Sequence, residues 1–264
     1  MKTTKEPLFL LSSIPYRDSD LVVNLLSSQH GKLSSVIYSG RKIGKTSSFL
    51  FQPGDLLEVE YQVKESNDFV KVINISSIAT LSTDKFSYNR FLFHSYLLEV
   101  ISKISQPGNP SDDLFNILLT NNQCKWKKEK SFYLIGRMIW MLTQHGGFGI
   151  DYHTCGKCQR PTMRFNESQT PSFRKENYQF SSNSGALLCD NCTPVTDPEE
   201  LITPSMLKVM WTMDTDISDH PETVTIPDSI MIEVILCLNR YLIQQYEIKP
   251  KSLSLFLGSL KASP

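Results

Sequence analysis

Four of the six cysteines stand in two Cys-x-x-Cys pairs, and this spacing constrains the fold more than any other feature of the chain. The pairs are Cys155 with Cys158 and Cys189 with Cys192, and 30 residues separate them. Two such pairs can bring four thiolates together around one ion, which is the ligand set of a structural zinc site. A redox dithiol fits less well, because a thioredoxin-like motif needs one Cys-x-x-Cys in a βαβ context, which the sequence lacks. We therefore predict one structural zinc ion bound by these four cysteines.

The residues around the two pairs support a metal site. Gly156 and Lys157 suit a tight turn that points backbone N–H groups at sulfur, and Lys157 and Arg160 place positive charge near a dianionic zinc–tetrathiolate centre. His153 is left out of the ligand set because four cysteines are already present. Cys124 and Cys237 are unpaired and lie near or in predicted helices, where we interpret them as ordinary buried or half-buried cysteines.

The segment between the pairs exceeds the usual ~15–20 residues of a two-knuckle zinc site. We therefore expect it to hold a small hairpin, packed by Phe173, Tyr178 and Phe180. Asn183-Ser184-Gly185 would form the turn that leads into the second pair. A site with four protein ligands has no open position for water or substrate, so the zinc would stabilise structure and not catalyse.

The first 80 residues have the pattern of a small β-barrel. Five short apolar runs, in which polar residues alternate, occupy residues 8–14, 20–29, 32–40, 55–63 and 70–79. Turn-forming residues separate the runs, including His30-Gly31 and the sequence Gln52-Pro53-Gly54-Asp55. Five strands in so short a segment predict a five-stranded, partly open barrel of the OB-fold type.

The apolar period becomes helical from about residue 84. Helices are expected over residues 86–104, 112–122, 131–149, from Thr203-Pro204 onward, and over about 228–246. The fold class is therefore α+β, with an OB-fold barrel followed by a helical body that carries the four-cysteine insert. We predict an OB-fold domain at 1–80, a first part of the helical body at 81–150, the zinc-finger insert at 151–199 and a C-terminal part of the helical body at 200–264.

The chain has no net charge, with 27 basic and 27 acidic residues, but the charge is segregated. Residues 1–50 carry seven Lys or Arg against three Asp or Glu, and residues 120–180 carry ten against four, whereas residues 181–264 carry five against eleven. This distribution favours a polyanionic partner that meets particular surfaces. No signal peptide or membrane span is evident, so we expect a cytoplasmic protein, in which disulfides are rare.

Catalytic motifs are not found. The stretch Gly40-Arg41-Lys42-Ile43-Gly44-Lys45-Thr46 ends like a phosphate-binding loop, but it has three residues between the glycines where such a loop has four, and an apparent strand follows. The five histidines are scattered, without a matching nucleophile motif. We expect a binding protein and not an enzyme.

Two basic segments are candidates for nucleic-acid contact. The first is the barrel loop with Arg41, Lys42 and Lys45, to which Arg17 and Lys32 add charge from the preceding turns. The second is residues 125–130, KWKKEK, where lysines surround Trp126. Cations bind phosphates and a flat ring stacks on bases. The alternative for either segment is a solvated lysine-rich surface.

Taken together, these motifs resemble the RecO family of bacterial recombination mediators and DNA repair proteins. The resemblance extends over nearly the whole chain. It includes IPYRDSDLVVNLLSSQHGKLSSVIYSGRKIGK and LFQPGDLLEVEYQVK near the start, the paired Cys-x-x-Cys insert, and LNRYLIQQYEIKPKSLSLFLGSL near the end.

The resemblance implies an N-terminal OB-fold, a helical body and an embedded zinc finger. It also implies binding of single- and double-stranded DNA, annealing of complementary strands, and loading of RecA together with RecR and sometimes RecF. Nucleoid association and binding of the acidic tail of single-strand-binding protein would follow. For that tail we expect an apolar groove in the helical body, with Lys127, Lys128 and Arg137 as cationic partners.

This chain departs from the family in its neutral charge and its less basic barrel loop, so we expect modest DNA affinity or greater dependence on RecR. Two rival interpretations stay open. An RNA-binding protein with an OB-fold and a zinc ribbon would prefer RNA, and a redox enzyme would show a low-pKa thiol instead of a filled metal site.

Overall fold

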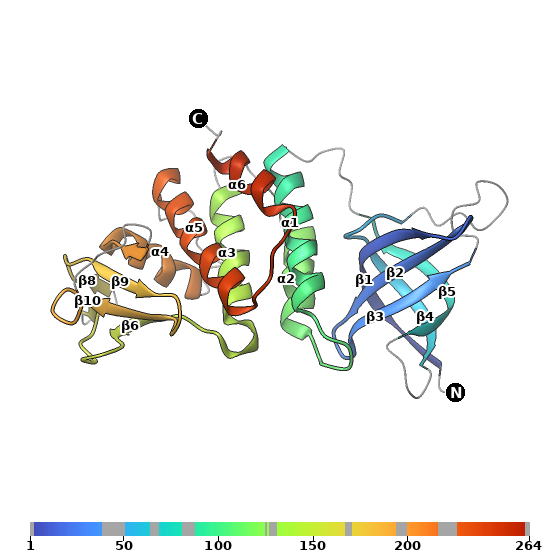
Figure 1. Ribbon diagram of the computed structural model, residues 1–264, viewed down its shortest axis with the longest axis horizontal. Helices are drawn as coiled ribbons and strands as arrows, with labels where there is room; N and C mark the ends of the chain where they lie inside the picture. The colour runs from blue at the N-terminus through green and yellow to red at the C-terminus, as the bar shows by residue number, and fades with distance from the viewer. Residues whose placement is uncertain are drawn as a thin grey trace. The chain divides into compact units, whose positions relative to one another are not determined.

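A computed structural model describes residues 3–38, 51–63, 69–80, 88–124, 126, 131–166, 171–193, 200–215 and 226–261. The chain forms two compact units. Unit 1 comprises Met1–Lys125 with Lys249–Pro264, and unit 2 comprises Trp126–Ile248 (Figure 1). The predicted four-part domain division at 80, 150 and 199 stays a prediction.

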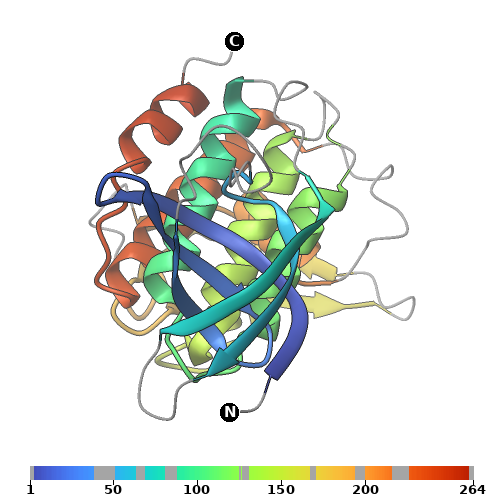
Figure 2. The same ribbon diagram turned by 90° about the vertical axis from the view of Figure 1, so that its right-hand side faces the viewer.

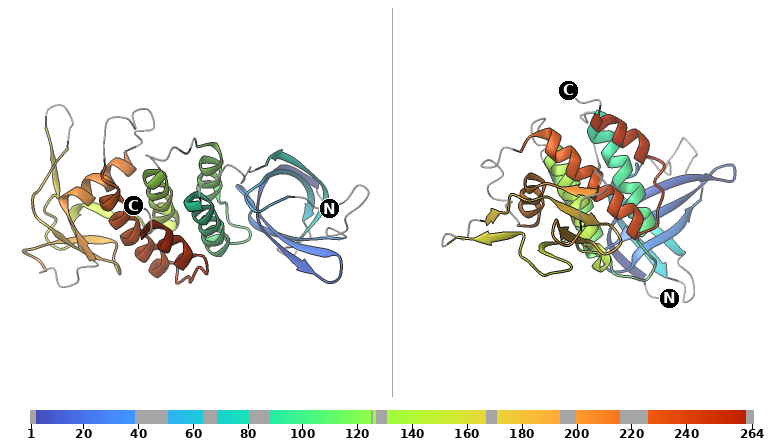
Figure 3. Two further views of the ribbon diagram at one scale, coloured as in Figure 1. Left: turned by 90° about the horizontal axis from the view of Figure 1, so that it is seen from above. Right: turned by 60° about the vertical axis from the view of Figure 1, so that its left-hand side comes forward.

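Unit 1 begins with a five-stranded antiparallel sheet. Its strands are β1 (Thr3–Tyr16), β2 (Asp20–Ser27), β3 (Gly31–Ile37), β4 (Leu56–Val63) and β5 (Val70–Ala79). They are ordered β3-β2-β1-β4-β5, and a parallel bridge between Ser34 and Phe69 brings the two edges together. The sheet therefore curves round on itself (Figures 2 and 3), which is consistent with the predicted OB-fold barrel.

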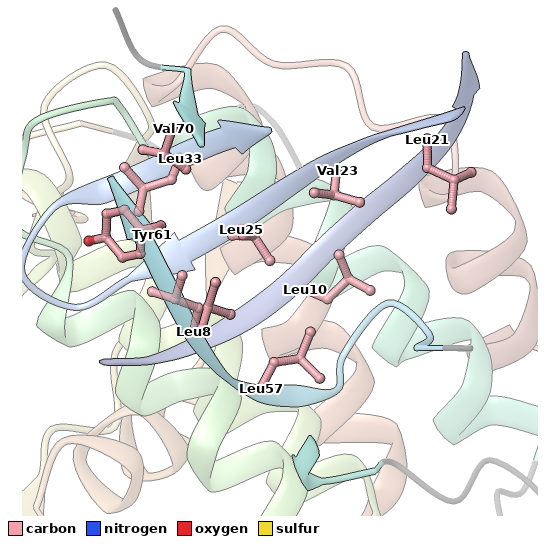
Figure 4. Close-up of a cluster of buried hydrophobic side chains, with 10 residues drawn as sticks. Leu8, Leu10, Leu21, Val23, Leu25, Leu33, Leu57, Tyr61 and Val70 are labelled. Carbon is pink, nitrogen blue, oxygen red and sulfur yellow. The ribbon is translucent and has the colours of Figure 1, made fainter. Parts of the chain in front are cut away.

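Alternation along these strands builds the barrel core. In β2 and β3, every second side chain points inward, so Val23 and Leu25 face Leu33 and the β1 residues Leu8 and Leu10 (Figure 4). The buried cluster is Leu8, Leu10, Leu21, Val23, Leu25, Leu33, Leu57, Val59, Tyr61 and Val70. The apolar runs identified in the sequence thus supply the inside of the barrel.

The described residues of unit 1 also form three helices: α1 (Tyr88–Ile104), α2 (Asp112–Gln123) and α6 (Leu253–Lys261). α6 was not predicted as a separate helix, because the last helix was expected to be the one near residues 228–246. It packs on α1 through Phe256, whose ring lies 4.9 Å from that of Tyr96 and 5.5 Å from that of Phe93. The segment after residue 248 therefore returns to unit 1.

The turn between β2 and β3 fixes the barrel to the loop between α1 and α2. Backbone N–H groups of Lys32, Gly108 and Ser111 donate across this junction to carbonyls of the opposite segment, at 3.2, 3.0 and 2.6 Å. Gly31 has a φ of 68°, and an added Cβ would collide with the carbonyl oxygens of Gln106 and Asn109. Glycine is therefore required at this predicted turn.

In its described residues, unit 2 contains three α-helices, a short 3₁₀ turn (η3, His145–Gly147) and six strands. The helices are α3 (Ser131–Gln144), α4 (Pro204–Asp214) and α5 (Asp228–Gln245). Thr203 caps α4 as predicted, because its hydroxyl accepts a hydrogen bond from the Met206 N–H at 3.3 Å. Gly136 lets α3 approach its neighbours closely, since an added Cβ would lie 2.5 Å from the Met213 methyl group.

The strands of unit 2 form two small sheets. β6 (Asp151–Cys155), β9 (Tyr178–Ser181), β10 (Ala186–Cys189) and β11 (Leu201–Ile202) form a four-stranded sheet ordered β11-β9-β10-β6. β7 (Met163–Phe165) and β8 (Pro171–Phe173) form a separate two-stranded sheet. The predicted turn at Asn183-Ser184-Gly185 connects β9 to β10, and Gly185 has a φ of 65°.

Across the described ranges, no helix has both the length and the apolar character needed to cross a bilayer.

Candidate metal centre and nucleic-acid interface

Two parallel strands place the four cysteines side by side. Cys155 ends β6 and is followed by the turn that carries Cys158, while Cys189 ends β10 and is followed by the turn that carries Cys192. β6 and β10 pair in parallel, with Leu187 opposite Cys155. Because the carboxyl ends of paired parallel strands lie at the same edge of a sheet, the two turns meet there.

The sulfur geometry fits a metal ion. All four Sγ atoms lie within 4.8 Å of one another, and those of Cys158 and Cys189 are 3.7 Å apart. Four sulfurs at ~2.3 Å from a common ion in tetrahedral geometry would be ~3.8 Å apart, whereas a disulfide requires ~2.05 Å. The cysteines are not paired in disulfides. Together they can hold one metal ion.

Backbone groups stabilise negative charge at this centre. The Cys189 N–H donates to Cys155 Sγ at 3.4 Å. Burial raises the pKa of Cys155, but backbone N–H groups of Cys158, Cys189 and Lys157 outweigh it and lower that pKa to about 6. Hydrogen bonding to Cys158, together with burial, raises the pKa of Cys192 to about 12. Four ionised thiols would repel one another here, and a bound dication removes that repulsion.

The residues next to the cysteines have separate contacts. Lys157 is exposed, and its backbone N–H points at the Cys155 sulfur, as predicted. Arg160 Nη1 lies 3.4 Å from a Glu176 carboxylate oxygen. His153 is exposed and its ring lies beside that of Tyr152, 4.2 Å between centroids. Among the residues placed by the structure, the metal-binding group contains cysteines alone.

The outer face of β1, β2 and β3 forms a second candidate site. Ser12, Asn24 and Ser34 make a polar row across the three strands, with two hydrogen bonds of 2.8 Å. The next rows toward the β1–β2 turn are apolar and aromatic. They consist of Ile14, Val22 and Val36, then Tyr16 and Asp20, and Tyr38 follows directly after the end of β3. The exposed fractions are 55% for Ile14, 41% for Tyr16 and 74% for Tyr38.

Helix α2 explains why only this end of the face is open. At the other end Phe9 and Leu26 are fully buried, and the Phe9 ring lies 4.8 Å from that of Phe115 in α2. Beyond the polar row, the face is exposed and carries large apolar and aromatic side chains. We call the part formed by Ile14, Tyr16, Val22, Val36 and Tyr38 the aromatic face.

The predicted DNA-binding cations have different positions. Arg17 lies at the turn beside the aromatic face, where its guanidinium carbon is 5.1 Å from the centre of the Tyr16 ring. Lys32 donates from Nζ to the Ser102 carbonyl in the last turn of α1 at 2.8 Å, so it supports the junction between barrel and helix. Arg41, Lys42 and Lys45 lie outside the described residues.

The predicted partner-binding residues are only partly placed. Lys127 and Lys128 lie outside the described residues, and Arg137 is half-buried in α3. Sequence reasoning missed Ile14, Tyr16 and Tyr38 as site residues. Alternation in residues 34–38 was a usable signal for Tyr38, because it places residues 34, 36 and 38 on one face of the strand.

Comparisons with known proteins relate the chain to one family. A family model described as "Recombination protein O N terminal" matches residues 1–81. A protein of Caldicellulosiruptor bescii named "DNA repair protein RecO" is 23% identical over 239 residues, which are 86% of this chain and 92% of that protein. Proteins of the same name from Thermodesulfovibrio yellowstonii and Syntrophus aciditrophicus are each 26% identical. The matches cover 70% and 72% of this chain, and 68% and 70% of those proteins. The predicted resemblance to the RecO family is confirmed.

Proposed function

We propose that this relative of the RecO family is a DNA repair and recombination mediator without catalytic activity of its own. It would bind single- and double-stranded DNA and anneal complementary strands. With RecR, it would help to load RecA onto DNA coated by single-strand-binding protein. The names and similarity of its relatives support the repair role.

The observation that carries the proposal is the aromatic face of the barrel. OB-folds bind oligonucleotides on the outer face of strands 2 and 3 and on the adjoining loops. In this chain the same face has two exposed tyrosine rings, with Arg17 beside one of them. Rings stack on bases without regard to sequence, and cations bind the phosphates. We propose that Tyr16 and Tyr38 stack on single-stranded DNA, while Arg17, Arg41, Lys42 and Lys45 bind its backbone.

Zinc is the proposed ion at the four-cysteine centre, because tetrahedral sites of four thiolates favour zinc. Cys155, Cys158, Cys189 and Cys192 would be its ligands. When bound, zinc would fix the ends of β6 and β10 relative to each other. Four protein ligands leave no place for a reacting water, so its proposed role is structural.

Protein partners are proposed on the family resemblance. RecR is the expected principal partner, with RecF and RecA as further candidates. The acidic tail of single-strand-binding protein would bind in the helical body through apolar contacts and through Lys127, Lys128 and Arg137. A carboxylate-rich tail needs such cations, because charge-assisted hydrogen bonds orient it.

Binding to labelled single-stranded DNA, measured by fluorescence anisotropy, tests the proposal. Base stacking contributes about 1–3 kcal/mol per base, so Tyr38→Ala should weaken binding roughly 5- to 150-fold. Tyr88→Ala is the matched control, because Tyr88 is 68% exposed but lies on α1, outside the aromatic face. Equal affinities of the two variants would refute a stacking role for this face.

The rival function is RNA binding by the same barrel. RNA and DNA oligonucleotides of one sequence, competed against each other, separate the two functions. A clear preference for RNA, or failure to accelerate annealing of complementary DNA strands, would overturn the proposed role in DNA recombination.

A further inference from the structure

The strands β7 and β8 form a ribbon that the metal centre does not require. They lie between the two cysteine pairs, in a sheet separate from the one that carries Cys155 and Cys189. No residue of the ribbon belongs to the metal-binding group. The long spacing between the cysteine pairs is therefore partly used to build an element that contributes no ligand.

The two faces of this ribbon differ in character. Met163 pairs with Phe173, and both side chains are at least half-buried on one face of the ribbon. β8 lies against α4, which covers part of the ribbon. Arg164 pairs with Ser172 on the opposite face, and both are exposed. Because neighbours on a strand point to opposite sides, the cationic face is the open one.

Positive charge predominates around the ribbon. Residues 156–166 and 171–177 contain five cations, namely Lys157, Arg160, Arg164, Arg174 and Lys175, and one carboxylate, Glu176. Glu176 is already engaged, because it lies 3.4 Å from Arg160 and 4.0 Å from Arg174 and accepts from the Tyr178 hydroxyl at 3.0 Å. Within the described part of the chain, Arg164 and Lys175 are exposed and make no ion pair with an acidic residue.

The ribbon also has an exposed aromatic ring, but on its other face. Phe165 ends β7 and pairs with Pro171 on the face that carries Met163, opposite Arg164, and it is 52% exposed at the end of the strand. A contact with nucleic acid therefore depends on the cations, which bind phosphates. A two-stranded ribbon also has the width that the major groove of duplex DNA accepts.

We infer that the β7–β8 ribbon is a second nucleic-acid contact, separate from the aromatic face of the barrel. Arg164 and Lys175 bind backbone phosphates. This inference rests on the proposed DNA-binding function and adds a binding element in the metal-binding insert. The group bound by the ribbon is the phosphodiester backbone, which single-stranded and duplex DNA both contain.

The test compares Arg164→Gln with the parent protein on labelled single-stranded and duplex DNA over a series of salt concentrations. Each lost phosphate contact lowers the slope of log affinity against log salt by about 0.9 for duplex and about 0.7 for single strands. We expect this decrease in slope with single-stranded DNA, with duplex DNA or with both. The DNA that shows the decrease is the one that the ribbon binds. Arg164→Lys keeps the charge and should restore the slope.

Lys249→Gln is the matched control, because it removes one exposed positive charge outside the insert. Metal content measured on each variant verifies that the insert is folded. If Arg164→Gln keeps the parent slope on both DNAs while the parent binds DNA, the ribbon inference is overturned and the proposed function stands. If the parent protein binds neither DNA, the proposed function fails first.

Discussion

His94 links three segments of unit 1 through one buried imidazole. It lies on α1 with 3% of its surface exposed, and its Nδ1 is 2.9 Å from the amide nitrogen of Asn121 in α2. Its Nε2 faces the Pro53 carbonyl at 3.5 Å. An amide donor on one side and a carbonyl acceptor on the other fit the neutral ring with its proton on Nε2. Burial lowers the pKa of His94 to about 4, and the nearby Arg90 charge acts in the same direction.

This shift makes the stability of unit 1 sensitive to mild acid. Between pH 6.5 and about 4 the unfolded chain binds a proton at His94 that the folded chain does not, so stability falls as pH falls. The loss is about 1.4 kcal/mol per pH unit, or about 3 kcal/mol over the window. Urea unfolding across this pH range should show that slope, and His94→Asn should reduce it. An equal slope in the variant would exclude His94 as the cause.

The metal centre gives a second prediction at the residue scale. Cys189→Ser removes one of the four sulfur ligands but keeps the backbone N–H that donates to Cys155 Sγ, so its effect falls on the metal site. We expect the parent to carry one zinc ion per chain and Cys189→Ser to carry almost none, because metal binding and folding are coupled in such sites. Mass spectrometry of the native protein measures the ratio. Cys124→Ser, outside the cluster, should keep its zinc.

At the scale of elements, a carboxylate of one helix caps another. Glu99 of α1 accepts from the N–H groups of Lys251 and Ser252 at 2.7 and 2.9 Å, and from the Ser252 hydroxyl at 2.7 Å. These donors lie at the start of α6, where backbone N–H groups have no partner within the helix. Burial raises the pKa of Glu99, but these hydrogen bonds outweigh it and lower that pKa.

Removal of this cap should release α6 from α1. Glu99→Ala leaves two backbone donors without their acceptor, which costs about 1–3 kcal/mol of unfolding free energy. Hydrogen exchange should increase in α6 more than in the barrel strands, and urea unfolding gives the total loss. Glu233→Ala is the control, because Glu233 is exposed on α5. Unchanged exchange in α6 would show that Phe256 packing alone holds the helix.

The same contact explains why α6 was not predicted. Residues 253–261 form a helix of nine residues, which is short for a periodicity argument, and its cap comes from a residue 152 positions earlier. By contrast, the five strands and the Thr203 cap depend on local patterns, and their existence was predicted correctly. Local sequence patterns predict individual helices and strands. Contacts between residues far apart in the chain, such as Glu99 with Ser252, cannot be recognised in a short segment of sequence.

A β-bulge in β1 is the reason that the aromatic face was not predicted from the sequence. Leu8 and Leu10 point into the barrel, so uninterrupted alternation would send residues 14 and 16 inward as well. The register of β1 against β2 shifts between Leu10 and Ser12, and this reverses the faces of Ile14 and Tyr16. The cysteine site was easier to predict, because its spacing alone specifies four ligands that converge.

At the scale of the whole molecule, the barrel and the metal centre belong to different compact units. The ten buried residues of the described barrel core all belong to β1–β5 in unit 1, while the four cysteines lie within unit 2. The two units therefore have separate sources of stability. Loss of the metal should unfold the insert without removing the contacts that hold the barrel closed.

We therefore expect Cys189→Ser to damage one unit and spare the other. Hydrogen exchange should lose protection in β6 and β10, which end at the cysteine turns, while β1–β4 keep the protection of the parent. Binding to single-stranded DNA should persist, and it should still be weakened by Tyr38→Ala, because stacking on the barrel does not need the metal. The ribbon contact should be lost, so Arg164→Gln should have no further effect on the salt slope in this background. If protection fell equally in β1–β4, barrel and insert would unfold as one cooperative body, and the metal would stabilise the whole chain.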